Sequence, residues 1–223
     1  MSNGSLDKWI FSEDNDSSLD WRTRKKIVKD IAKGLAYLHE ECRYKIAHLD
    51  VKPHNILLDE NFNAKLSDFG MSKLIRREKS QVTTGVRGTL GYLAPEWLHS
   101  RITVKADIYS FGIVLLELVS GRKILDYNQP ESEVHLLSLL QNKFLDQNQL
   151  MDIVDSQCED MLQHKEEATD MIRLGICCLN SDYTKRPPMS IVVKILEGEM
   201  VLEPKSIYNF LSIRVPATSS SFP

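Results

Sequence analysis

The stretch that decides the fold reads HLDVKPHN over residues 48–55, and DFG follows it over residues 68–70. Two short β-prone pieces lie between them, ILL at 56–58 and AKL at 64–66, joined by a polar turn, which predicts a small β-hairpin. A hairpin returns the chain to the place where it began. We therefore expect Asp68 to lie beside Asn55, so that polar side chains from both stretches gather at one site.

The order of these residues resembles the catalytic loop and the metal-binding motif of protein kinases. An Asp is followed by a Lys two residues later, an Asn five residues later and then Asp-Phe-Gly after the hairpin. Either part alone is weak, because Asp50 could be a turn residue and Asp-Phe-Gly is common. Together and in this order, with a strand pair between them, they favour the family strongly.

The resemblance implies a role for each polar residue in the transfer of a phosphoryl group from ATP, which depends on positioning and charge neutralisation. Asp50 would orient the attacking hydroxyl and accept its proton, and Lys52 would stabilise the charge that develops on the phosphate. Asn55 and Asp68 would supply oxygen ligands to Mg²⁺ and so help to bind ATP. Leu57 would lie beneath the adenine ring, although it could equally be a plain core leucine.

Later motifs extend the resemblance over nearly all of residues 1–200. The triplet APE at 94–96 is expected to close the activation segment. In the family, an Asp at the position of Asp107 anchors the backbone of the catalytic loop from below. Arg186 is expected to pair with Glu96, because a buried charge needs a partner of opposite sign.

Four segments are similar to plant receptor-like kinases, particularly the lectin-type receptors: NGSLD at 3–7, LDW at 19–21, GLAYLH at 34–39 and GTLGYLAPEW at 88–97. Lys52 and the Gly88-Thr89 pair resemble serine/threonine rather than tyrosine kinases. The resemblance implies a serine/threonine protein kinase that acts on a protein hydroxyl. It also implies a place on the cytoplasmic face of the plasma membrane if the chain is part of such a receptor, and in the cytoplasm otherwise.

The rest of the pattern predicts a mainly α-helical fold with a small β-hairpin region, the C-terminal lobe of the kinase fold. Asp20 is a candidate N-cap for a helix to about residue 41, and Thr103 for a helix over 104–120 that ends at Gly121. Further helices are expected near 132–143, 165–179 and 188–200, and a long loop over 70–93. We expect one lobe over residues 1–204 and a flexible tail over 205–223.

Leu49 departs from the family pattern, because many kinases carry Arg at this position. That Arg pairs with a phosphate on the activation segment, which leucine cannot do. We therefore expect that phosphorylation of Thr83, Thr84 or Thr89 does not switch the protein through the usual ion pair. Leu49 removes no catalytic group, so the departure concerns regulation rather than activity.

A second departure is the lack of a Gly-rich phosphate loop and of a Val-Ala-Ile-Lys strand, which the family places before the position of Met1. The resemblance therefore implies that the N-terminal β lobe is absent from this sequence. ATP would then lie in an open, wet site where electrostatic interactions are weak, and the isolated chain would have little or no activity. Leu6, Leu57 and Phe69 would be exposed as an apolar surface.

Two other functions remain open. The chain could be a catalytically inactive interaction module that binds kinase substrates or partners without turnover. A magnesium-dependent hydrolase that uses Asp50 and Asp68 is also possible, but it explains none of the later motifs.

Composition narrows the class of protein further. Hydrophobic residues make up 42% and the formal net charge is -3, so a soluble domain without overall attraction to nucleic acid is expected. The longest apolar run, 108–119, is shorter than the roughly 20 residues that span a bilayer, so no membrane-spanning segment is expected. None of the four cysteines forms a C-x-x-C pair, which argues against a zinc site. The adjacent Cys177 and Cys178 lie in an apolar helical stretch and are expected to be buried thiols.

Overall fold

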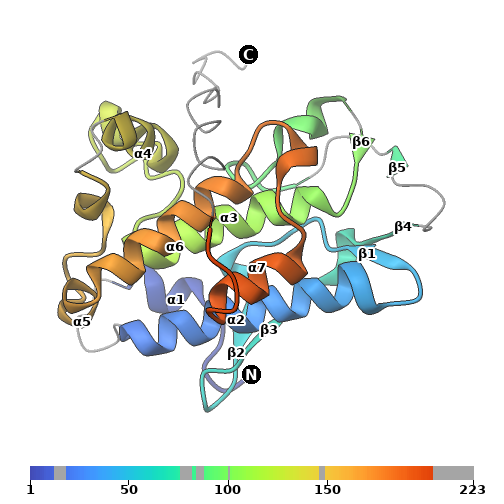
Figure 1. The fold of residues 1–223 in the computed structure, drawn as a ribbon, viewed down its shortest axis with the longest axis horizontal. Coiled ribbons are helices and arrows are strands. Elements are labelled where there is room, and N and C mark those ends of the chain that lie inside the picture. The colour runs from blue at the N-terminus through green and yellow to red at the C-terminus, as the bar shows by residue number, and fades with distance from the viewer. Residues whose placement is uncertain (13–18, 76–81, 84–87, 100, 146–148, 203–223) are drawn as a thin grey trace.

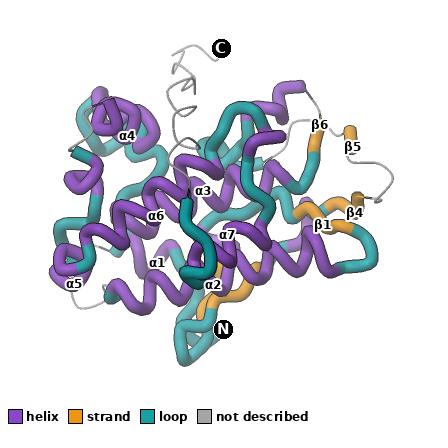
Figure 2. Tube along the Cα trace, in the orientation of Figure 1, coloured by secondary structure: helices purple, strands orange, loops and turns teal. Residues whose placement is uncertain are grey.

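The computed structural model describes residues 1–12, 19–75, 82–83, 88–99, 101–145 and 149–202. These residues form a mainly helical body with three small two-stranded sheets, which confirms the predicted fold class. Helices α2 (Trp21–Ala36), α3 (Lys105–Ser120) and α6 (Lys165–Cys178) run through the body, and the shorter α7 (Met189–Leu196) packs against α2 (Figure 1). The strands lie at the edge of this helical body (Figure 2).

Helix α2 begins where the sequence predicts. The Asp20 side chain accepts a hydrogen bond from the Thr23 N–H at 2.7 Å and caps the first turn. The apolar residues of its inner face recur at helical spacing and are buried: Ile27, Ile31 and Leu35. The α-helix ends at Ala36, and a wider π turn, Tyr37–Glu41, continues it to the predicted end.

Helix α3 is the centre of the core, because every residue from Ala106 to Ser120 is buried. A helix that is buried on all sides must be covered on all sides, and α6 approaches closely at Gly112. A Cβ atom at Gly112 would lie 2.9 Å from the Cβ atom of Cys178. The helix begins at Lys105, one residue later than predicted. The Thr103 hydroxyl accepts the Lys105 N–H at 3.0 Å, and Gly121, with φ of 66°, ends the helix.

The predicted hairpin is confirmed. β2 (Ile56–Leu58) and β3 (Ala64–Leu66) pair in antiparallel register. The prediction of one long loop over 70–93 is wrong in part, because this region holds short strands. β4 (Lys73–Ile75) pairs with β1 (Lys45–Ala47), and β5 (Val82–Thr83) pairs with β6 (Arg101–Ile102). Strands of two or three residues show no periodicity of their own, and their partners lie far away in the sequence.

The other helices are shorter: α1 (Asp7–Ile10), α4 (Leu136–Leu145) and α5 (Glu159–Gln163). The helices predicted near 132–143, 165–179 and 188–200 correspond to α4, α6 and α7. α7 ends early, at Leu196, and Gly198 follows with φ of 78°. The predicted tail over 205–223 lies outside the described residues. No helix in the described ranges is both long enough and apolar enough to cross a lipid bilayer.

The predicted exposure of three apolar side chains is confirmed only for Phe69, which is 48% exposed. Leu6 is fully buried, so that prediction is wrong. The reason is that residues 3–6 run beside β2, where the Leu6 N–H donates to the Ile56 carbonyl at 2.9 Å, and Leu6 joins the core. Leu57 is partly buried.

The predicted pairing of Glu96 with Arg186 is confirmed. Arg186 Nη1 lies 2.6 Å from Glu96 Oε1, and Nη2 lies 2.7 Å from Oε2, in a two-pronged ion pair. Both side chains are buried, and Arg186 also donates to the carbonyl oxygens of Asn180 and Lys105. The pair therefore ties the segment after Pro95 to the start of α3.

Removing one partner of this buried pair should be strongly destabilising, because the other charge is left without compensation. We expect Glu96→Ala to lower the free energy of unfolding by about 3–5 kcal/mol in urea denaturation. Glu133→Ala is the matched control, since Glu133 pairs with Arg122 at 2.9 Å where both side chains are part-exposed. Glu133→Ala should lower the free energy of unfolding by no more than about 1 kcal/mol. Equal losses in the two variants would contradict this account.

Glu117 is a second buried acid on α3. Its two carboxyl oxygens lie 2.9 Å or less from the Tyr92 hydroxyl, and Oε1 accepts the Ile124 N–H at 2.8 Å. Burial raises the pKa of Glu117 to about 8, although these hydrogen bonds and the charge of Lys123 act against the rise. A tyrosine hydroxyl both donates and accepts, so it can satisfy the neutral carboxyl group.

The raised pKa of Glu117 predicts a pH-dependent stability. Between the ordinary pKa of 4.5 and about 8, the folded protein keeps a proton that the unfolded chain has released. The contribution of Glu117 to the free energy of unfolding should therefore fall as the pH rises through this interval. Urea denaturation over a pH series should show a weaker fall in Glu117→Gln than in the wild type. Identical pH dependence in the two proteins would disprove the assignment.

Candidate active site

The loop that carries Asp50 is held from below by the buried carboxylate of Asp107, near the start of α3. Asp107 Oδ2 accepts the His48 N–H and Oδ1 accepts the Leu49 N–H, each at 2.7 Å. Leu49 has φ of 69°, a left-handed conformation that costs a residue with a side chain of order 1–3 kcal/mol. The predicted contact of Asp107 with the loop backbone is thereby confirmed, and it holds Leu49 in this conformation.

Asp50 lies at the centre of a polar cluster. Asn55 Nδ2 donates to Asp50 Oδ2 at 2.7 Å, and Lys52 Nζ lies 2.9 Å from the same oxygen. The Thr89 hydroxyl donates to Asp50 Oδ1 at 3.0 Å and in turn accepts from Lys52 Nζ at 2.8 Å. Three of these residues come from the loop over 48–55, and Thr89 reaches them from a distant part of the chain.

The cluster keeps Asp50 ionised. Burial acts to raise the pKa of this carboxyl group, but hydrogen bonds from Lys52, Thr89 and Asn55 outweigh burial and hold the pKa below its ordinary value. Asp50 is therefore a carboxylate at neutral pH. An acceptor of this kind can orient a hydroxyl group that approaches it, while Lys52 supplies a positive charge at the same place.

Asp68 lies beside Asn55, as the hairpin predicts. The N–H and the hydroxyl of Ser67 both donate to the Asn55 backbone carbonyl at 2.9 Å, which brings the next residue alongside. Asp68 is exposed and has φ of 59°. Its Oδ1 atom accepts the Gly70 N–H at 3.2 Å. The two predicted metal ligands therefore approach each other from the two ends of the hairpin.

The donor set of this pair fits Mg²⁺. Asn55 Nδ2 donates to both the carbonyl and the carboxylate of Asp50, which fixes the amide so that Oδ1 faces away from Asp50. Among the described residues, no hydrogen-bond donor approaches Asn55 Oδ1 or Asp68 Oδ2. An amide oxygen and a carboxylate oxygen are the hard ligands that Mg²⁺ prefers.

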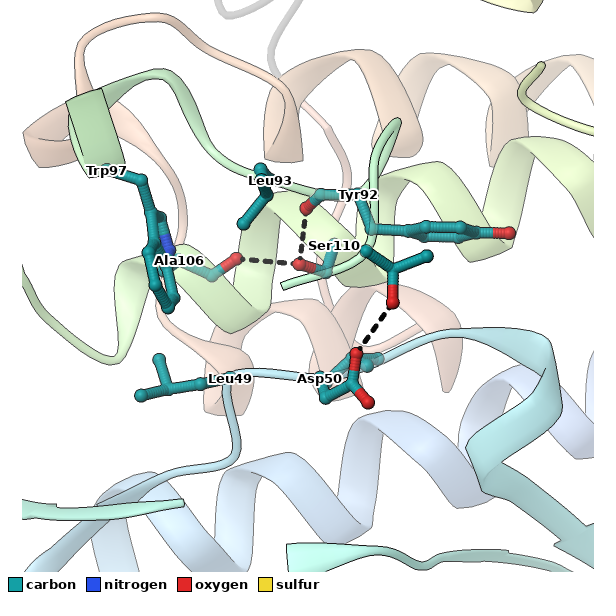
Figure 3. A pocket seen from close by; sticks show the side chains of 9 residues that line it. Leu49, Asp50, Tyr92, Leu93, Trp97, Ala106 and Ser110 are labelled. Carbon is teal, nitrogen blue, oxygen red and sulfur yellow. Dashed lines mark hydrogen bonds between the residues drawn. The ribbon is translucent and has the colours of Figure 1, made fainter. Parts of the chain in front are cut away.

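The side chain of Leu49 is buried and lines a small cavity with Leu93 and Trp97 (Figure 3). The Ser110 hydroxyl of α3 holds the neighbouring backbone, since it donates to the Tyr92 carbonyl at 2.8 Å. The polar residues Asp50, Thr89 and Ser110 line the same cavity. Leu49 itself brings no charge to the cavity, and the expectation that phosphorylation does not act through this residue stays a prediction.

The structure brings Asp50, Lys52 and Asn55 into one hydrogen-bonded cluster, with Asp68 beside it. Leu57 lies on β2, two residues after Asn55, and as an apolar residue takes no part in the cluster. Sequence reasoning missed the contact of Thr89 with Asp50, because 39 residues separate them. The signal lies in the Gly88-Thr89 pair, which the sequence relates to the serine/threonine class and to phosphorylation of Thr89 but not to a contact with Asp50. The structure leaves Thr84 and the side chain of Thr83 undescribed.

Comparison with known proteins agrees with this geometry. Residues 1–196 match the family described as protein kinase domain. The chain is 48% identical over 209 residues to the G-type lectin S-receptor-like serine/threonine-protein kinase SD2-5 of Arabidopsis thaliana, over 92% of this chain and 25% of that protein. A second G-type lectin S-receptor-like serine/threonine-protein kinase of that plant is 47% identical over 200 residues, 89% of this chain and 23% of the relative.

A probable LRR receptor-like serine/threonine-protein kinase of Arabidopsis thaliana is 45% identical over 209 residues, which is 92% of this chain and 20% of that protein. The chain thus spans a quarter or less of the length of these three curated relatives. The family match covers most of the chain, and the polar cluster lies within it. The chain therefore belongs to the protein kinase domain family and, within it, is similar to plant receptor-like serine/threonine kinases.

Proposed function

We propose that the protein transfers the γ-phosphoryl group of ATP to a serine or threonine hydroxyl of a protein substrate. The observation that carries this proposal is the ionised Asp50 carboxylate, within 2.9 Å of Lys52 and 3.0 Å of Thr89. Phosphoryl transfer needs an oriented hydroxyl and positive charge at the phosphate, and the cluster supplies both. The family membership and the serine/threonine kinases among the relatives support the same reaction.

In the proposed reaction, Asp50 and Lys52 of the polar cluster act on the substrate hydroxyl and on the transferring phosphoryl group. The substrate oxygen forms a bond to the γ-phosphorus while the bond from that phosphorus to the β–γ bridging oxygen breaks, and ADP leaves with the electron pair. Asp50 orients the hydroxyl by a hydrogen bond and receives its proton. Because the pKa of Asp50 is low, the proton moves late, when bond formation has made the hydroxyl acidic. Lys52 balances charge on the transferring group.

Asn55 and Asp68 would hold Mg²⁺ through Oδ1 and a carboxylate oxygen. The metal neutralises phosphate charge when it is bound. Leu57 on β2 offers an apolar surface for the adenine ring. The exposure of Phe69 and the partial exposure of Leu57 leave apolar surface at this end of the hairpin.

We further propose that residues 1–204 act as the lobe that carries the catalytic loop, and that turnover requires a second lobe to cover ATP. In a receptor-like protein this lobe would work on the cytoplasmic face of the plasma membrane. Residues 1–223 alone should give little magnesium-dependent transfer, and a longer protein that also contains a Gly-rich strand lobe should give more. Strong turnover by residues 1–223 would contradict the need for that lobe. No turnover by the longer protein would favour an interaction module.

Replacing the carboxylate of Asp50 tests its role. Asp50→Asn keeps the size of the side chain but removes the proton acceptor, so transfer to a Ser/Thr peptide should fall by about 10²- to 10⁴-fold. The assay uses the longer, active protein with radiolabelled ATP. Asp170→Asn is the control, because Asp170 is exposed on α6 and pairs only at the surface with Arg173. A wild-type rate in Asp50→Asn would remove Asp50 from the mechanism.

The position of Leu49 in the cavity beside Leu93 and Trp97 predicts how the site is regulated. Leu49→Arg should place a positive charge in this cavity, and a phosphate on the activation segment could compensate that charge. We expect the variant to depend on that phosphate, with lower activity after phosphatase treatment, whereas the wild type should respond little. Activity of Leu49→Arg that is the same with and without the phosphate would contradict the prediction.

A further inference from the structure

His39 makes a buried contact with the residue that holds the catalytic loop. Its Nε2 atom lies 2.8 Å from Asp107 Oδ2, and both side chains are almost fully buried. Because the Asp107 carboxylate accepts two backbone N–H groups at the same time, it acts as an acceptor toward His39 as well. Nε2 of His39 must therefore carry the proton and donate it.

The other ring nitrogen of His39 has no such partner. Nδ1 is buried and makes no hydrogen bond within the described part of the chain. A buried polar atom without a hydrogen-bond partner destabilises the folded state. His39 also lies within the π turn Tyr37–Glu41, and such turns are rare in helices and frequent at functional sites. An apolar residue would fill the same space without an unpaired atom, so space filling does not explain the histidine.

The contact between His39 and Asp107 is linked to Asp50 through Leu49. Asp107 Oδ2 is shared between His39 Nε2 and the His48 N–H, and Oδ1 accepts the Leu49 N–H. Leu49 is the residue with φ of 69°, directly before Asp50. A carboxylate that loses its side-chain donor can rotate, and either loop N–H then loses its alignment. The left-handed Leu49 would relax first, and Asp50 would move with it.

We propose that His39 is a positioning residue: its Nε2–H group fixes the rotation of the Asp107 carboxylate, which in turn holds the strained backbone before Asp50. The inference rests on the proposed function only in that the loop it positions is the catalytic loop. The contact itself is a property of the fold and can be tested without any activity.

Two substitutions of similar length separate positioning from packing. In glutamine the amide Nε2 follows Cβ, Cγ and Cδ, so His39→Gln places a donor where the imidazole Nε2 lies. His39→Met fills similar space with no donor. Amide hydrogen exchange of residues 1–223, followed by NMR, should show the His48 and Leu49 amides exchanging about tenfold faster in His39→Met, and close to wild type in His39→Gln. The Leu58 amide, which donates to the Gly4 carbonyl at 2.8 Å, serves as the internal reference and should change in neither.

Wild-type protection of both loop amides in His39→Met would overturn the proposal, and so would equal acceleration in the two variants. In the longer, active protein, His39→Met should lower kcat about tenfold with an unchanged KM for ATP, and His39→Gln should restore kcat. If that protein has no kinase activity, the proposed function fails while the exchange result still decides the role of His39. Rapid exchange of the His48 and Leu49 amides in the wild-type protein would also overturn the proposal that His39 is a positioning residue.

Discussion

The site depends on one buried carboxylate. Asp107 is fully buried in the middle of an apolar core, where an acid without partners would be costly. It is satisfied by the backbone N–H groups of His48 and Leu49 and by the ring of His39. The hydrogen bonds that compensate the burial of Asp107 also fix the loop that carries Asp50. The stability of α3 and the geometry of the polar cluster around Asp50 therefore have a common origin.

A second set of contacts brings the segment after Asp68 to that cluster. Glu96 and Arg186 fix its far end by a buried ion pair, and Ser110 and Glu117 hold Tyr92 against α3. With its far end fixed, the segment places Thr89 on Asp50 and Lys52. Leu49, which carries no charge, lines the small cavity beside this cluster together with Leu93 and Trp97.

The sequence predicts those parts of the molecule whose signals are local. The cap at Asp20, the hairpin between Asn55 and Asp68 and the central helix after Thr103 all follow from neighbouring residues, and boundaries differ by one or a few positions. The pairing of β4 with β1 and the contact of Thr89 with Asp50 could not be predicted from pattern, because they join segments far apart in the chain. From sequence, Leu6 is expected to be exposed because a covering lobe is absent from the sequence. The pairing of residues 3–6 with β2, which buries Leu6, has no local sequence signal.

The measurement that tests this account most directly is phosphoryl transfer by Asp107→Asn in the longer, active protein. The amide nitrogen of asparagine cannot accept a hydrogen bond, so one of the two loop N–H groups loses its acceptor while size and core packing are kept. Circular dichroism should show a folded protein, and the rate of transfer should fall about a hundredfold, because a small displacement of Asp50 is sufficient for such a loss. A folded variant that transfers phosphate at the wild-type rate would contradict the claim that the buried carboxylate sets the geometry of the site.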